Sequence, residues 1–348
     1  MSKYPCYPVI FLVLLLGNSP YLPAQEQSDK KIILVEKAKQ VTDLEAAQAA
    51  EMDSEKNPDG GYNANPTVVD CFAAMKYHYT GGRYVDEPIY FRMRFPEKIE
   101  PGKKYPLILS LHGVGESGND NQRQLSHLHY ALKSFVGKNT LDFFMIVPQC
   151  PEDNKTWETS ISNEGKGDAP LTIANEILGH VIEEYPIDLN RIGVIGICSG
   201  GNAAWEYVAN NPGRFSALAA FSSTPGRVNP NAFLNTAVWA FNNKDDVVPY
   251  QVTEKFVNDI NALNGNAYVT LWDHGGHITW PSPLSRKNLV NWVVLQNLDG
   301  TGILQEKVYY HRSVVQLFFM FGLPVVIIVV SLMVLTFQKR KTIRPENL

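Results

Sequence analysis

The sequence lacks most of the patterns that mark nucleotide, metal and nucleic-acid binding. Its 348 residues contain no phosphate-binding glycine loop, no internal repeat and no cysteine or histidine cluster with metal-ligand spacing. The net charge is −4, so there is no basic surplus of the kind that nucleic-acid binding needs. These absences predict a protein with no metal or other cofactor and no nucleic-acid partner.

Cysteine is scarce as well, with four in the whole chain. One of them, Cys6, precedes the N-terminal apolar run and should be lost with a cleaved signal peptide, so Cys71, Cys150 and Cys198 remain. An odd number of cysteines in an oxidising compartment leaves one thiol unpaired. A Cys71–Cys150 disulfide with a free Cys198 is one expectation, and two buried free thiols at Cys71 and Cys150 are the other, since spacing alone cannot show proximity.

Both ends of the chain carry apolar runs that predict membrane targeting. Residues 1–24 have a basic start, a short apolar run and small residues up to Ala24, the pattern of a cleaved signal peptide. Residues 314–337 are almost wholly apolar, and about 20 such residues span a bilayer. The basic tail 338–348 favours a cytoplasmic C-terminus. A single-pass cell-membrane protein with an extracytoplasmic (periplasmic or extracellular) domain is therefore predicted, and a buried core helix at 314–337 is the alternative.

Between these ends we expect a polar stalk or pro-segment at 25–65, one folded domain at 66–298 and a tether at 299–313. Strands are predicted at 72–79, 89–94, 107–111, 143–147, 191–195, 217–221, 238–241 and 268–272. Helices are predicted at 121–135, 171–184, 202–210, 250–264 and 283–296. This alternation predicts an α/β fold with a mostly parallel sheet covered on both faces and with functional loops at the carboxyl ends of its strands.

The most informative run is RIGVIGICSGGNAAW, residues 191–205. A β-branched strand enters Gly196-x-Cys198-x-Gly200, and a small, helix-compatible stretch follows. A sharp strand–turn–helix needs glycines on either side of its strained central residue, because the two backbones approach closely there. This register makes Cys198 the candidate nucleophile, activated by the helix N-terminus and a neighbouring imidazole. Ser199 is the alternative, although it would place an isoleucine at a crowded position.

An acid and a histidine follow the elbow in the order that a nucleophile elbow requires. Asp245 is the first choice for the acid and Asp246 the fallback, since spacing cannot separate adjacent carboxylates at the end of a strand. His277, after paired glycines, is the candidate base, and His274 is interpreted as an exposed loop residue. The base would take the thiol proton, and the acid would hold the imidazole in the right tautomer.

An earlier strand ends at HGVGESG, where backbone donors for an oxyanion are expected. The N–H groups of Val114 and Ser199 form the predicted pair. The residues expected to contribute to the substrate pocket are His112, Glu116, Trp157 and Trp280.

Five runs, LILSLHGVGESGNDN, FFMIVPQCPEDNKTW, IDLNRIGVIGICSGGNAAW, FNNKDDVVPY and GGHITW, together resemble the polyhydroxybutyrate-depolymerase-like and feruloyl-esterase-like group of α/β-hydrolases, on the dienelactone-hydrolase side of that superfamily. The resemblance implies a Cys198–His277–Asp245 triad and cleavage of a small-molecule or oligomeric ester or lactone through an acyl thioester. Most of that group has serine at the nucleophile position, whereas dienelactone hydrolases have cysteine. A Ser199-based esterase, acyltransferase or peptidase and a non-catalytic binding protein on the same fold are the alternatives.

Overall fold

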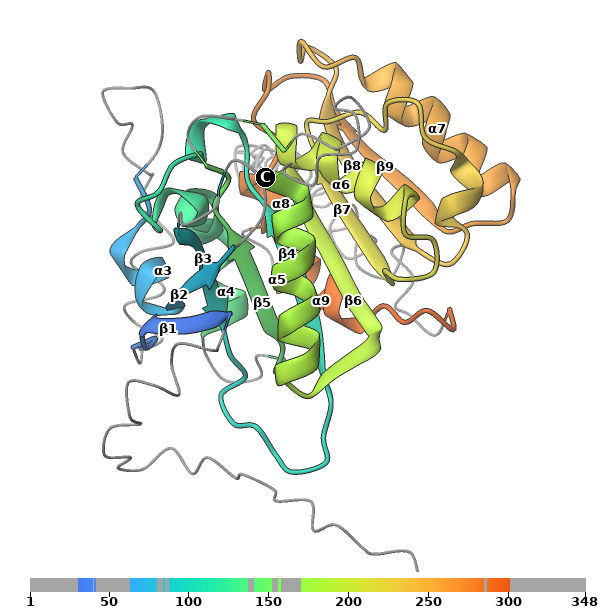
Figure 1. Ribbon diagram of the computed structural model, residues 1–348. Coiled ribbons are helices and arrows are strands. Elements are labelled where there is room, and N and C mark those ends of the chain that lie inside the picture. Colours follow the sequence, from blue (N-terminus) through green and yellow to red (C-terminus); the bar gives the residue numbers. More distant parts are fainter. Residues whose placement is uncertain are drawn as a thin grey trace, which may run out of the picture.

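The computed structural model describes residues 31–39, 41, 63–79, 84, 88–136, 141–151, 156–157, 170–284 and 287–300. These residues form one sheet with helices against both faces (Figure 1). The predicted signal peptide (1–24), membrane span (314–337) and tail (338–348) lie outside the described residues, as does all of the predicted tether but its first two residues. Within the described part of the chain, no helix has the length and apolar character needed to cross a membrane.

The sheet combines an antiparallel edge with a parallel body. Its strands are β1 (Ile32–Glu36), β2 (Ala73–His78), β3 (Pro88–Arg94), β4 (Tyr105–Leu111), β5 (Phe144–Pro148), β6 (Ile187–Ile197), β7 (Ala217–Phe221), β8 (Ala237–Asn243) and β9 (Ala267–Trp272). Their order is β1-β2-β3-β5-β4-β6-β7-β8-β9. The pairs from β1 to β5 are antiparallel and those from β5 to β9 are parallel. The predicted α/β class with a mostly parallel sheet is confirmed.

Helices cover each face of this sheet. They are α3 (Pro66–Asp70), α4 (Leu132–Phe135), α5 (Pro170–Glu184), α6 (Ser199–Ala209), α7 (Tyr250–Ala262), α8 (Pro281–Leu284) and α9 (Lys287–Leu295), with 3₁₀ segments η2 (Val114–Glu116), η3 (Arg123–Ala131) and η5 (Pro230–Phe233). Helices α5, α6 and α7 contribute to one apolar core, and α3, α8 and α9 to the other. The helix predicted at 121–135 is instead η3 followed by α4. In η3, the His129 ring bonds the Ser126 carbonyl at 2.6 Å, a local contact that competes with α-helix bonding.

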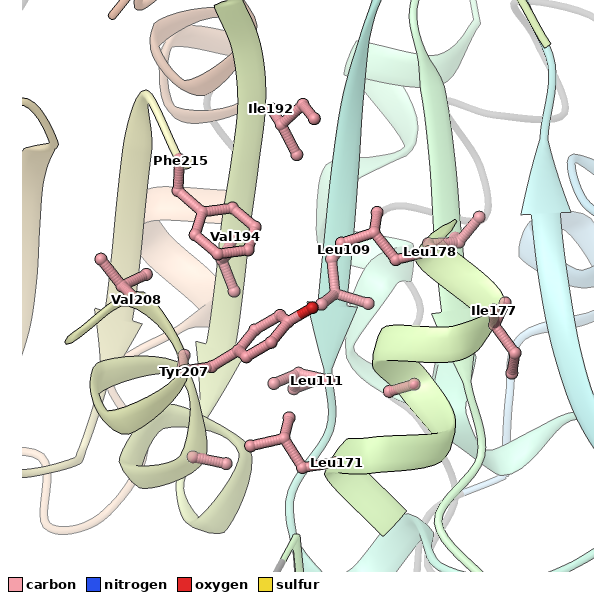
Figure 2. Close-up of a cluster of buried hydrophobic side chains, with 14 of the residues drawn as sticks. Leu109, Leu111, Leu171, Ile177, Leu178, Ile192, Val194, Tyr207, Val208 and Phe215 are labelled. Atoms are coloured by element: carbon pink, nitrogen blue, oxygen red, sulfur yellow. The ribbon is translucent and has the colours of Figure 1, made fainter. Parts of the chain in front are cut away.

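The strands at the centre of the sheet are apolar on both faces because helices bury both of them. Figure 2 shows one such face, where Leu109 and Leu111 of β4 and Val194 of β6 meet Leu178 of α5 and Tyr207 of α6. This packing makes the centre of the sheet a rigid base for the loops at the strand ends.

One boundary prediction is wrong. The segment 25–65, interpreted as a stalk, contains β1, which pairs with β2 through Ile32–Tyr77, Ile33–Lys76 and Leu34–Met75. Only Ile32 of this strand is buried, so the segment looks polar when averaged over a helical window. The short run IILV carries the strand signal, and the sheet therefore begins well before the predicted start at residue 66.

None of the three described cysteines forms a disulfide, as in the second expectation for Cys71 and Cys150, although only Cys150 is buried and Cys71 is half-buried. The Cys71 thiol donates to the Thr67 carbonyl and the Cys150 thiol to the Thr156 carbonyl, each at 3.3 Å. Burial raises the pKa of Cys71 to about 12. That thiol is therefore protonated at neutral pH and inert as a nucleophile.

Candidate active site

The turn between β6 and α6 places Cys198 in a strained conformation, with φ 55° and ψ −119°. The Cys198 N–H donates to the carbonyl of Phe221 at 3.0 Å, which ties the turn to β7. A Cβ at Gly200 would collide with two carbonyl oxygens at the end of β4, and a Cβ at Gly196 would collide with the Gly200 carbonyl. The two glycines thus let the strand and helix approach closely, and the strained residue is the cysteine.

Ser199, the alternative nucleophile, is the first residue of α6. Its hydroxyl oxygen is buried and has no hydrogen-bond partner among the described residues. A serine needs an adjacent base to attack a carbonyl. Among the described residues, no base contacts the Ser199 hydroxyl.

We expect Gly200→Ala to destabilise the protein by roughly 1–3 kcal/mol or more, since overpacking typically costs that much and the added Cβ meets rigid backbone. The matched control is Gly179→Ala in the middle of α5, where a Cβ meets nothing within 4 Å. That change should be neutral or stabilise by up to about 1 kcal/mol. Urea unfolding of both variants measures the difference, and equal midpoints would contradict the close approach at the elbow.

The ring of His277 lies between the Cys198 thiol and a carboxylate. Its Nδ1 lies 2.9 Å and 3.0 Å from the two carboxylate oxygens of Asp246. The Asp246 side chain is completely buried, whereas that of His277 is 35% exposed. The hydrogen bond with Cys198 is the largest cause that raises the pKa of His277, to about 9, and the bond to Asp246 adds to it while burial opposes it. The imidazole is therefore protonated at neutral pH.

The structure corrects the choice of acid, because Asp246 contacts the ring and Asp245 does not. Asp245 is 42% exposed and accepts the backbone N–H groups of Gly275 at 3.2 Å and Gly276 at 2.8 Å. These bonds hold its pKa below the usual value. Asp245 thus holds the backbone of the histidine loop, and Asp246 orients the imidazole. His274 is 91% exposed, in keeping with its interpretation as a loop residue.

Two further residues that the sequence analysis did not find support the same loop. Ser222, which follows β7 with φ 44°, donates its hydroxyl to the His277 carbonyl at 2.6 Å. Asn243, the last residue of β8, donates its amide to the Gly276 carbonyl at 2.8 Å. Their positions at the carboxyl ends of neighbouring parallel strands were the available signal, because such ends lie at one edge of a sheet.

The predicted oxyanion donors lie on segments that meet at Cys198. Val114 opens η2 and Ser199 opens α6, and the first N–H groups of a helix have no acceptor within it. A Cβ at Gly113 would lie 3.4 Å from the Cβ of Cys198, so the turn that carries the Val114 amide packs against Cys198. The arrangement suits a pair of donors aimed at one oxygen.

His112 and Trp157, which the sequence predicts to contribute to the substrate pocket, have buried rings that are held by hydrogen bonds. His112 contacts the Gly113 carbonyl through Nδ1 at 2.6 Å, and its Nε2 accepts the N–H of Cys150 at 2.9 Å. Burial lowers the pKa of His112, which keeps the ring neutral as this pattern requires. The Trp157 indole N–H donates to the His112 carbonyl at 2.8 Å. These residues brace the end of β4.

Glu116 and Trp280 are also buried, at 3% and 7% exposure. The Glu116 carboxylate lies 3.1 Å from the imidazole Nε2 of His127. The Trp280 ring stands edge-on to His277 with centroids 6.2 Å apart. Their contribution to a substrate pocket stays a prediction. Among the described residues, no group of histidine, cysteine or acidic side chains could hold a metal ion.

A strained elbow on β6, a histidine loop after β9 and an acid after β8 are the parts of an α/β-hydrolase. Residues 82–297, more than half of the chain, match the Esterase family, described as "Putative esterase". The chain belongs to this family of carboxylic ester hydrolases. It is similar to a thermostable esterase at 25% identity with a TM-score of 0.58, covering 66% of this chain and 64% of that one. The chain thus spans somewhat less than two thirds of that esterase.

Two Staphylococcus aureus structures are similar to this chain at a lower level. The S-formylglutathione hydrolase FrmB is 14% identical with a TM-score of 0.48, covering 64% of this chain and 98% of that one. The fluorophosphonate-binding serine hydrolase FphF is 14% identical with a TM-score of 0.47 and the same coverage of 64% and 98%. A sequence comparison with curated proteins gave no match.

Proposed function

We propose that this protein hydrolyses carboxylic esters or lactones with Cys198 as nucleophile, His277 as acid and base, and Asp246 as the orienting carboxylate. The observation that carries the proposal is the contact of His277 with both partners, through a hydrogen bond to Cys198 and Nδ1 contacts to Asp246. Membership of the Esterase family supports the substrate class.

The chemistry follows from the protonated imidazole. The thiolate of Cys198 attacks the substrate carbonyl, a C–S bond forms, and the carbonyl electron pair moves onto oxygen next to the Val114 and Ser199 amides. When the C–O bond breaks, the leaving alkoxide takes the proton of His277. The neutral imidazole then takes a proton from water, whose oxygen attacks the thioester. The acid and the thiolate are released, and the imidazole is protonated again.

A panel of esters, lactones and peptides tests this proposal on the full-length chain. We expect turnover of esters or lactones, and intact mass should show a transient gain equal to the acyl group. Digestion and fragmentation should place that mass on Cys198. An acyl group on Ser199, or turnover of peptides alone, would contradict the proposal.

The raised pKa of His277 sets an expected pH dependence. Acylation should slow as pH rises through about 9, because the imidazole then lacks the proton that the alkoxide needs. The kcat/KM of a small ester against pH measures this limb, with the Cys198→Ala protein as the blank for alkaline hydrolysis. Asp246→Asn should move the limb to lower pH, since the contact with Asp246 raises this pKa. A rate still rising above pH 10 would contradict the assignment.

We also propose that the domain acts outside the cytoplasm, held to the cell membrane by residues 314–337. Support comes from the sequence of the two termini. Protease added to intact cells should cleave the domain while the tail 338–348 stays protected. Recovery of the whole chain in the soluble fraction would contradict the anchor.

A further inference from the structure

A buried carboxylate next to the site has no part in the mechanism above. Glu116 is the last residue of η2, the 3₁₀ turn that follows Gly113, and it is 3% exposed. A buried carboxylate is costly unless it is paired and hydrogen-bonded. His127 of η3 supplies the partner, with its Nε2 3.1 Å from Oε1 of Glu116.

The other carboxylate oxygen faces the oxyanion turn. A Cβ at Gly113 would lie 3.0 Å from Oε2 of Glu116, and the Gly113 N–H donates to this carboxylate. Burial alone would raise the pKa of Glu116, but the interactions with His127, and smaller ones with His112 and the Gly113 N–H, outweigh it and hold that pKa below its usual value. The ionised carboxylate therefore fixes the His112–Gly113 peptide, which is one peptide before the one that carries the Val114 N–H.

The imidazole of His127 also contacts the ring of Trp280. Its ring centroid lies 4.7 Å from that of Trp280, and the Trp280 ring stands edge-on to His277. Glu116, His127 and Trp280 thus form a continuous chain of contacts from the oxyanion turn to the base. Glu116 comes from η2 and His127 from η3, and Trp280 is the residue that precedes α8.

We propose that Glu116 and His127 are a positioning pair. They hold the Val114 N–H in the position where it faces the carbonyl oxygen of the bound ester. The inference rests on the proposed function. Glu116 occupies the Gly113 N–H, which leaves the Val114 N–H as the donor of this turn that can face the substrate. Neither side chain takes or gives a proton in the reaction.

The test separates oxyanion stabilisation from nucleophile activation. Glu116→Ala should lower kcat on a small ester by about 10- to 100-fold, approaching the loss of one oxyanion donor, with KM changed less than about twofold. Iodoacetamide alkylation of Cys198 should keep its rate within about twofold, because sulfur displaces iodide at carbon without forming an oxyanion. Glu116→Gln, which retains an acceptor for Gly113, should lose less than alanine does.

The matched control is Glu176→Gln on α5, which also removes the charge of a hydrogen-bonded carboxylate, here the partner of Tyr77 at 2.7 Å. It should leave both rates unchanged. If Glu116→Ala does not fold by circular dichroism, Glu116→Gln decides, with an expected kcat loss of about 3-fold or more. Unchanged kcat in the folded variant, or alkylation falling in step with kcat, overturns the positioning pair. Absence of ester turnover in the unmodified protein overturns the proposed function as well.

Discussion

Cys198→Ala is expected to reduce ester turnover by about 10⁶-fold, the scale seen when a covalent nucleophile is removed from a triad. The variant lacks the thiol that forms a hydrogen bond with His277 at the strained turn between β6 and α6. A stopped assay with a chromogenic ester, calibrated on the unmodified protein, measures the loss. Residual catalysis through the oxyanion donors should remain above the rate in water alone.

Cys71→Ala is the matched control, because Cys71 is also a free thiol but lies at the end of α3 with its sulfur bonded to a carbonyl. Its activity should stay within about twofold of the unmodified protein, and iodoacetamide should still inactivate it. Activity that survives Cys198→Ala but is lost in Ser199→Ala would move the nucleophile to Ser199 and refute the cysteine mechanism.

The second large effect is expected at Asp246, and the same change at the adjacent Asp245 should have a much smaller effect. Asp246→Asn should lower kcat by about 10³- to 10⁴-fold, because an amide favours the wrong imidazole tautomer and removes the charge that stabilises the imidazolium. The Asp246 side chain is fully buried against Nδ1 of His277, so no solvent replaces it. Steady-state kinetics of the folded variant measure the change.

Asp245→Asn provides the comparison within the same turn. An asparagine oxygen can still accept the Gly276 N–H that Asp245 accepts at 2.8 Å, and the residue is partly exposed. We expect a loss of less than about 10-fold. If Asp245→Asn were the more damaging change, the assignment of the acid to Asp246 would be wrong.

The strained elbow was open to prediction because its cause is local. Two glycines at fixed spacing around Cys198, between a β-branched strand and a small-residue helix, determine the register, and the structure has φ 55° at Cys198. The parallel body of the sheet was predictable for a similar reason, since each strand is a short apolar run between helical stretches.

The acid was not open to prediction, because its identity depends on side-chain direction. Asp245 and Asp246 are adjacent, and the loop after β8 turns one carboxylate toward backbone amides and the other toward the imidazole. Spacing along the chain carries no information about that turn. The same limit explains the pocket residues, since proximity of His112 and Trp157 to the site could be inferred but their mutual hydrogen bond could not.

The edge of the sheet illustrates a third limit. A strand that buries a single side chain gives little periodic signal, so β1 was hidden in a polar segment. Its pairing partner β2 is more informative, with Ala73, Met75 and Tyr77 all buried on the sheet.

The position of β1 also bears on how this domain can be produced in isolation. A chain begun at residue 66 would leave out β1 and uncover the backbone donors and acceptors of β2 along a row of apolar side chains. Bare strand edges of that kind invite pairing with other chains and precipitation. An expression boundary upstream of Ile32 keeps β2 paired with β1. The short, mostly exposed β1 then protects the apolar part of the sheet from pairing with another copy of the chain.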